Sequence, residues 1–209
     1  MKNTRISRGY NRLAPFYTVS AKLVFGNTLQ RAQKFFLDQI RDSDRVLILG
    51  GGSGELLTAL LRQHPRVKID YIDISPRMIE LARRKNHNPD NVNFIIGTER
   101  QIPEGPYSVI ITNFYLDLFN DQTLEQIIHQ IKPNLAANVT WLATDFVSEK
   151  IWHKVFLGMM YAFFKIVTGM QTHTLPHWQG ALTKSGMQEH ISKKFYRGFI
   201  KSSVYKIVQ

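Results

Sequence analysis

Three glycines at alternate positions stand where a strand is expected to turn into a helix. Gly50, Gly52 and Gly54 lie between an apolar run and a run with helical spacing. Glycine allows a tight strand-to-helix reversal, close approach of a ligand to the backbone and tight packing of the helix against a strand. Asp73 ends a second apolar run about 20 residues later, where a carboxylate can bond both hydroxyls of a ribose. The pattern predicts a nucleoside cofactor site, and its glycine spacing disfavours dinucleotides, which need G-x-G-x-x-G.

Three further side chains are candidates for a catalytic role. Asp117 follows the fourth expected strand, where it could act on a substrate or cap the next helix. His153 is a candidate base because imidazole titrates near neutral pH. Tyr161 lies in segment 151–167, whose aromatic and methionine side chains suit an apolar or aromatic acceptor. The same composition is equally typical of a core or dimer helix, or of a helix on a membrane surface.

Several chemistries are excluded by what the sequence lacks. It has no cysteine, so disulfides, thiolate metal sites and a catalytic thiol are ruled out. His173 and His177 are four residues apart, but Pro176 between them argues against a helical metal pair. We therefore expect no metal site.

The elements that must position these residues alternate between strand and helix from residue 45 onward, which predicts βαβ units and a parallel sheet. We expect strands at 45–50, 67–74, 92–98, 107–114 and 138–146, helices at 55–64, 75–86 and 121–131, and a hairpin at 188–208.

The fold class is α/β: a Rossmann-like seven-stranded sheet of five parallel strands plus a C-terminal antiparallel hairpin, with helices on both faces. Residues 1–209 form one domain, comprising an N-terminal helical cap (1–44), a cofactor-binding core (45–146), a lid or acceptor segment (147–180) and C-terminal strands (181–209).

These segments resemble successive motifs of the class I S-adenosylmethionine-dependent methyltransferases, in particular the small-molecule and ubiquinone-menaquinone methyltransferase branch. The segments that carry the resemblance are VLILGGGSGELL, IDYIDISPRMIELARR, VNFIIGTER, YSVIITNFYLDLF and IIHQIKPNLAANVTWLATDF. The resemblance implies S-adenosylmethionine as cofactor and a small-molecule methyl acceptor, with a lipid quinone as one specific case.

The resemblance also implies roles for individual residues. Gly50, Gly52 and Gly54 would pass the methionine part of the cofactor, and Asp73 would hold its ribose hydroxyls. The other cofactor-binding residues it implies are Ile74 on an adenine face, Thr98 and Glu99 near the adenine amino group, Asn113 and Phe114 near the sulfonium, and Tyr10 and Tyr17 in an amino-terminal segment that closes over the cofactor.

The chain departs from the family pattern at three places. Ile48 stands where the first motif is often acidic, Thr98 replaces the third-motif aspartate, and Asn134 with Leu135 replaces a double glycine. The first two changes remove polar contacts, so the resemblance implies a weaker affinity for the cofactor.

Positive charge gathers at the two ends of the chain. The net charge is +11, and residues 147–209 hold nine Lys or Arg against two acids. Such ends could attract nucleic acid, anionic lipid or an acidic substrate. An RNA or tRNA methyltransferase and a non-catalytic cofactor-binding domain are therefore the alternatives. Nucleic acid is the less favoured partner because Asn113-Phe114-Tyr115 lacks the prolines typical of base amino-group methylation.

The amino-terminal residues show no apolar stretch typical of a secretory signal, so we expect a cytoplasmic protein. The charges at 153, 154 and 165 argue against a membrane-spanning helix. Peripheral membrane contact and a monomeric or homodimeric state both stay open.

Overall fold

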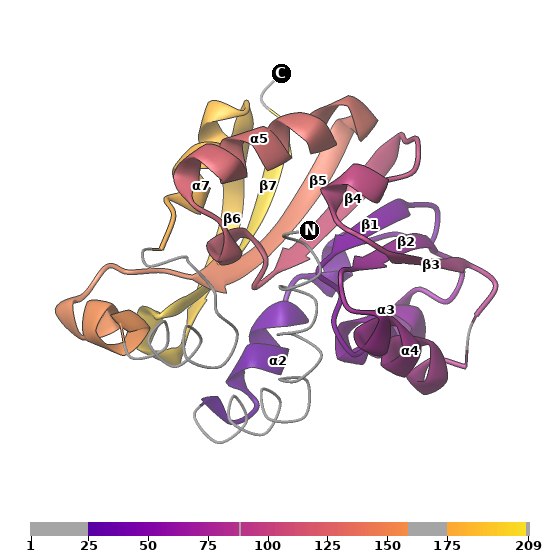
Figure 1. The fold of residues 1–209 in the computed structure, drawn as a ribbon, viewed down its shortest axis with the longest axis horizontal. Helices are drawn as coiled ribbons and strands as arrows, with labels where there is room; N and C mark the ends of the chain where they lie inside the picture. Colours follow the sequence, from indigo (N-terminus) through magenta and orange to yellow (C-terminus); the bar gives the residue numbers. More distant parts are fainter. Residues whose placement is uncertain (1–24, 88, 159–174, 208–209) are drawn as a thin grey trace.

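The computed structural model describes residues 25–87, 89–158 and 175–207. A seven-stranded sheet in these residues has the order β3-β2-β1-β4-β5-β7-β6 (Figure 1). Its strands are β1 (Arg45–Leu49), β2 (Lys68–Asp73), β3 (Val92–Ile96), β4 (Tyr107–Asn113), β5 (Leu135–Phe146), β6 (Met187–Phe195) and β7 (Ile200–Ile207). Strands β1 to β5 pair in parallel, and β7 is antiparallel to β5 and β6. The predicted fold class is confirmed.

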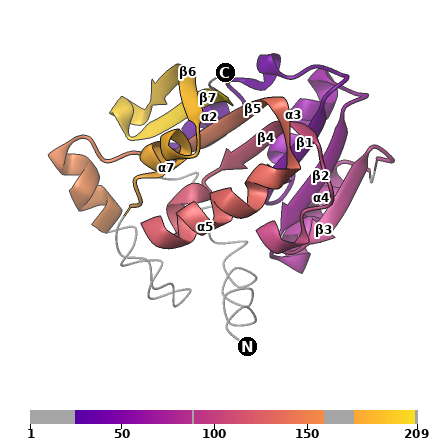
Figure 2. The ribbon, with the colours of Figure 1, turned by 90° about the horizontal axis from the view of Figure 1, so that it is seen from above.

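Helices cover both faces of this sheet (Figures 1 and 2). The helices are α2 (Thr28–Gln33), α3 (Glu55–Gln63), α4 (Pro76–Lys85), α5 (Asp121–Ile131) and α7 (Trp178–Lys184). Val46 and Ile48 pack in one core with α3 and α4, whereas Leu47 and Leu49 pack in the other with α5 and α7. Because β1 is buried on both faces, its sequence reads as a continuous apolar run.

The helix boundaries follow local signals. Ser75 caps α4 by accepting a hydrogen bond from the Met78 N–H at 3.3 Å, with Pro76 in the first turn. Helix α5 ends at Ile131, ahead of a 3₁₀ turn that contains Pro133. Strand β5 then begins at Leu135, three residues before the expected start at 138, because Leu135 already pairs with the first residue of β4.

The two ends of the expected lid or acceptor segment, 147–180, differ in structure. Residues 151–158 are helical, whereas Trp178 at the start of α7 is buried in the core, and its Nε1 donates to the Phe146 carbonyl at 2.9 Å. The apolar side of α7 packs against α5 and the sheet, and the role of segment 147–180 stays a prediction. Within the described residues, no helix is long and apolar enough to cross a membrane.

Candidate functional site

The glycine turn after β1 is built from left-handed backbone. Gly52 and Gly54 have φ angles of 69° and 91°, which side-chain-bearing residues rarely adopt. A Cβ added to Gly54 would lie 2.9 Å from Ala82 Cα. This glycine therefore lets α3 pack against α4, whereas the sequence pattern predicted packing against a strand. A Cβ added to Gly52 would meet no atom of the described residues within 4 Å. Gly52 is therefore where the turn leaves its backbone accessible to a ligand.

The carboxylate of Asp73 joins the end of β2 to this turn. Its Oδ2 accepts a hydrogen bond from the Gly52 N–H at 2.8 Å, and its Oδ1 accepts one from the Ser75 N–H at 2.8 Å. Burial raises the pKa of Asp73, while these two N–H groups favour the charged form. Each carboxylate oxygen retains a free lone pair, so the group can accept two more hydrogen bonds.

Tyr71 is a part of the turn that sequence reasoning missed. Its hydroxyl donates to the Gly52 carbonyl at 3.0 Å, and its ring fills the space beneath Gly51, where an added Cβ would lie 2.2 Å from a ring atom. The signal that could have revealed this contact is Gly51 itself, the glycine of the GGG run outside the alternating spacing.

The ends of β3 and β4 are joined by one hydrogen bond. The Tyr115 hydroxyl donates to a Glu99 carboxylate oxygen at 3.2 Å. Thr98 caps the short 3₁₀ turn that follows β3, and its hydroxyl accepts from the Arg100 N–H at 3.4 Å. Thr98 and Glu99 thus lie beyond the same sheet edge as Asp73, as does the half-buried Ile74.

Asn113 and Phe114 lie where β4 ends. The Asn113 side-chain nitrogen is buried and has no hydrogen-bond partner among the described residues. Phe114 has a φ of 51°, and its N–H donates to the Thr144 carbonyl at 2.7 Å. A buried unpaired amide costs free energy unless a ligand satisfies it, and strained backbone of this kind gathers at functional sites.

Two buried carboxyl groups lie close together near the carboxyl ends of β4 and β5. Asp145 Oδ2 accepts from the N–H groups of Leu116 and Asp117 at 3.0 and 3.2 Å. Asp117 Oδ1 is buried without a partner among the described residues. Burial raises the pKa of Asp117 to about 6, and burial with the Asp117 charge raises the pKa of Asp145. The helix-cap alternative for Asp117 is wrong, since Asn120 caps α5 through the Thr123 N–H.

His153 is buried on the helix that follows β5. Its Nδ1 accepts from the Glu149 N–H at 3.2 Å, and burial lowers its pKa, which favours the neutral ring at pH 7. Phe114, Phe146, Phe199 and His153 form a run of rings whose successive centres are 4.9, 4.9 and 5.3 Å apart. His153 is thus separated from Phe114 by two rings. Tyr10, Tyr17 and Tyr161 lie outside the described residues, so their roles stay predictions.

The comparison with protein families agrees with this arrangement. Residues 46–138, which include the glycine turn, Asp73 and the end of β4, match a family model described as a methyltransferase domain. Over these residues the chain is similar to known methyltransferases, which agrees with the resemblance of its motifs to the class I S-adenosylmethionine-dependent methyltransferases.

Curated relatives and solved structures show the same similarity. Malonyl-[acyl-carrier protein] O-methyltransferase 1 of Ilyobacter polytropus is 29% identical over 119 residues, 56% of this chain and 44% of that protein. The chain spans about half the length of the first curated relatives it matches. Among solved structures, the Haloferax volcanii methyltransferase in complex with the Trm112 activator has a TM-score of 0.73 at 16% identity, covering 97% of this chain and 96% of that one. Human N-acetylserotonin methyltransferase with its cofactor has a TM-score of 0.65 at 18% identity, covering 88% and 52%.

The residues at the sheet edge fit S-adenosylmethionine, the cofactor of this methyltransferase family. The turn at Gly52 leaves backbone accessible, Asp73 keeps lone pairs for two hydroxyl groups, and Asn113 holds an unsatisfied donor. In the part of the chain that the structure describes, no group of three His, Asp or Glu side chains could hold a metal ion.

Proposed function

We propose that this chain transfers the methyl group of S-adenosylmethionine to a small apolar or aromatic acceptor. The observation that carries the proposal is the grouping of Gly52, Asp73 and Asn113 at one sheet edge. Among the described residues, no atom crowds the Cβ side of Gly52, the Asp73 carboxylate can accept two more hydrogen bonds, and the Asn113 side-chain nitrogen has no partner. The fold is also that of solved O-methyltransferases, among them a mitomycin 7-O-methyltransferase.

The chemistry asks little of the protein beyond alignment. The bound cofactor supplies an electrophilic methyl carbon on a sulfonium, and the sulfur leaves with the electron pair as the acceptor atom attacks. Asp73 would orient the ribose, and Asn113 would bind the amino-acid end of the cofactor. The chain must then hold the acceptor atom about 3 Å from the methyl carbon and exclude water, which aligned apolar side chains accomplish.

Asp117 is the described side chain best suited to accept a proton from the acceptor. Its free Oδ1 and its pKa of about 6 make it a usable base near neutral pH. The run of rings from Phe114 to Phe199 supports an apolar or aromatic acceptor. His153 and Tyr161 remain the other candidates.

Titration calorimetry with S-adenosylmethionine and with its demethylated product tests the cofactor site. We expect Asp73→Ala to weaken binding by about 1 to 3 kcal/mol, the cost of leaving buried hydroxyls unpaired. Asp70→Ala is the matched control, because Asp70 is a buried carboxylate of the same strand that binds Tyr107 and Arg45 instead. Absence of binding of either compound by the unaltered protein would overturn the proposal.

The acceptor class is tested with a labelled methyl donor and a panel of a phenol, a quinol, a malonyl thioester and bulk tRNA. We expect label on the phenol or the quinol. Label on the malonyl thioester would move the acceptor class to that of the Ilyobacter relative's name. Salt-sensitive binding and labelling of tRNA would instead favour the nucleic-acid alternative.

A further inference from the structure

The helix formed by residues 151–158 has apolar side chains on two sides. His153 and Leu157 are buried on the side that packs against Phe199. On the other side, Ile151 is 83% exposed and Val155 60% exposed. A soluble helix normally presents one apolar side to its core and polar residues to water, so the second side needs an explanation.

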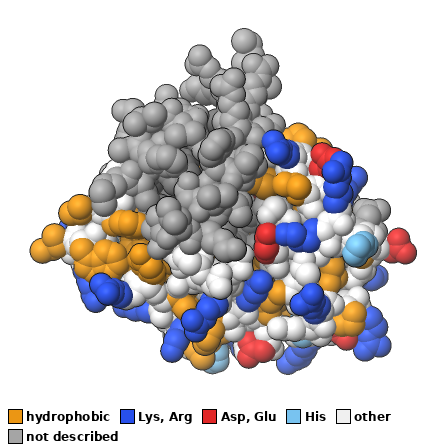
Figure 3. Space-filling view, turned by 90° about the horizontal axis from the view of Figure 1, so that it is seen from below, with side chains coloured by type: hydrophobic (Ala, Val, Ile, Leu, Met, Phe, Trp, Pro, Cys, Tyr) orange, Lys and Arg blue, Asp and Glu red, His pale blue; other side chains and the backbone are white. Residues whose placement is uncertain are grey.

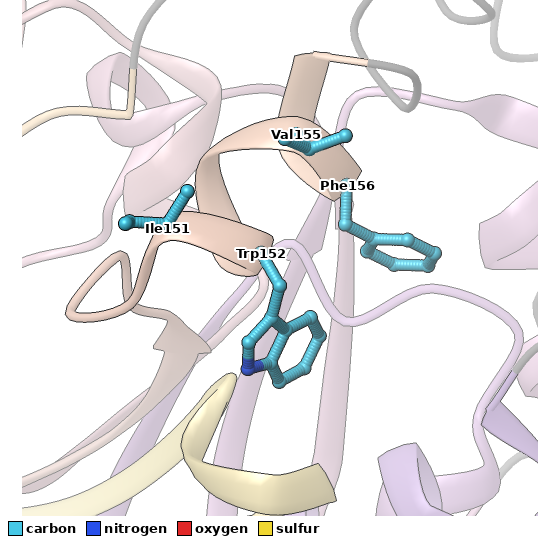
Figure 4. A pocket seen from close by; sticks show the side chains of 4 residues that line it. All are labelled: Ile151, Trp152, Val155 and Phe156. Carbon is cyan, nitrogen blue, oxygen red and sulfur yellow. The ribbon is translucent and has the colours of Figure 1, made fainter.

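Four of these side chains form a continuous apolar surface. Ile151, Trp152, Val155 and Phe156 line one open depression, and Figure 4 shows them arranged along two turns of the helix. In Figure 3 hydrophobic side chains gather at this end of the molecule, with Lys and Arg side chains close by. We refer to Ile151, Trp152, Val155 and Phe156 as the apolar face.

Positive charge borders the apolar face. Segments 149–158 and 193–198 hold five Lys or Arg and one acid, Glu149, which is paired with Lys194 at 2.5 Å. Lys150 reaches across to the Arg197 carbonyl at 3.4 Å, so the two segments form one surface. Lys154 is exposed on the helix itself.

We propose that the apolar face docks on a membrane surface that contains anionic lipid. Apolar side chains of an interfacial helix enter the boundary between headgroups and acyl chains, while nearby Lys and Arg attract anionic headgroups. Trp152 suits this boundary because its ring is apolar and its N–H is polar. A second copy of this chain fits less well, since two such faces would bring like charges together. The docking does not depend on the proposed methyl transfer.

Vesicle binding tests this docking directly. The full chain is sedimented with vesicles of phosphatidylcholine, with and without phosphatidylserine. We expect binding to the anionic vesicles that weakens with salt, and a loss of about tenfold or more in Lys150→Gln/Lys154→Gln. Ile151→Ser/Val155→Ser should lose binding as well, whereas Ile96→Ser, an exposed isoleucine of β3, should bind as the unaltered chain does.

Tryptophan fluorescence supplies a second readout. Of the three tryptophans in the sequence, Trp141 and Trp178 are buried and Trp152 is 36% exposed. Anionic vesicles should therefore shift the emission to shorter wavelength, and Trp152→Phe should abolish the shift. Unshifted emission and no sedimentation with anionic vesicles would overturn the proposal. So would a dimer that Ile151→Ser/Val155→Ser dissociates in the absence of lipid, because the apolar face would then be a subunit interface.

Discussion

The glycine turn and the carboxyl-terminal part of the sheet are held together by different kinds of contact. In residues 45–101, the turn at Gly52 is held by short polar contacts to Asp73 and Tyr71. In residues 135–207, the elements are held mainly by large apolar side chains such as Trp178 and Phe199. Residues 45–101 hold nine Lys or Arg and six acids, whereas residues 147–209 hold nine Lys or Arg and two acids.

This difference shows which parts of such a fold leave a sequence signature. A cofactor bound through backbone and one carboxylate demands glycine at fixed positions and an acid at a fixed spacing. An apolar acceptor region demands only enough large side chains, in many arrangements. We therefore expect stability to depend mainly on side-chain packing in the carboxyl-terminal region and on backbone geometry in the glycine turn.

The largest effect is expected at Trp178, which is fully buried in the carboxyl-terminal region. Trp178→Ala should lower the free energy of unfolding by about 3 to 5 kcal/mol, because it leaves a cavity and removes the bond to the Phe146 carbonyl. Chemical denaturation measures the loss. Trp152→Ala is the matched control, and an equally large loss there would show that Trp152 is a core residue.

A smaller, pH-dependent effect is expected at Asp117. Its pKa is about 6 in the folded chain against an ordinary value of 3.8, so the folded state holds a proton that the unfolded state has released between these values. The stabilisation is full below about pH 4 and is lost as the pH rises through about 6, a fall of up to about 3 kcal/mol. Asp117→Asn should reduce this fall, because its amide can donate to Asp145 at every pH, while the raised pKa of Asp145 leaves a remaining fall.

Denaturation of Asp117→Asn and the unaltered chain from pH 4 to pH 8 checks this. The two stabilities should diverge with rising pH, with the variant the more stable at pH 8. Asp90→Asn, at an exposed site, should run parallel to the unaltered chain. If the stability curves of Asp117→Asn and of the unaltered chain stay parallel, the raised pKa of Asp117 is contradicted.

The smallest change in stability is expected at Gly52. Gly52→Ala should cost about 1 to 2 kcal/mol, because alanine is strained at a φ of 69° although space is free around it. Its effect on cofactor affinity should be the larger one, since the new methyl group would occupy the side left accessible to a ligand. Calorimetry and thermal melts separate the two effects, and normal affinity in a folded Gly52→Ala would place the cofactor elsewhere.

The sequence alone predicted the positions of the strands and of the glycine turn better than it predicted the tertiary packing. The alternation of apolar runs with helical spacing located β1 to β4 within two residues, because each run is buried whole. The proximity of Asp73 to the glycine turn could be predicted because it depends on a short, fixed spacing, and its role in binding the cofactor stays a prediction. Asp145 capping the turn at Leu116 was not predicted, since that contact joins residues 29 positions apart. The placement of Trp178 likewise depends on tertiary packing that no local pattern encodes.

The position of β7 bears on how the chain is synthesised. β7 follows β6 in the chain but lies between β5 and β6 in the sheet. While a ribosome is still producing residues 200–207, β5 has an edge of unpaired N–H and C=O groups beside β4, and β6 has no strand to join. Such an edge can recruit strands from neighbouring nascent chains. The β5 edge is therefore covered only after β7 has been synthesised, although β6 precedes β7 in the chain.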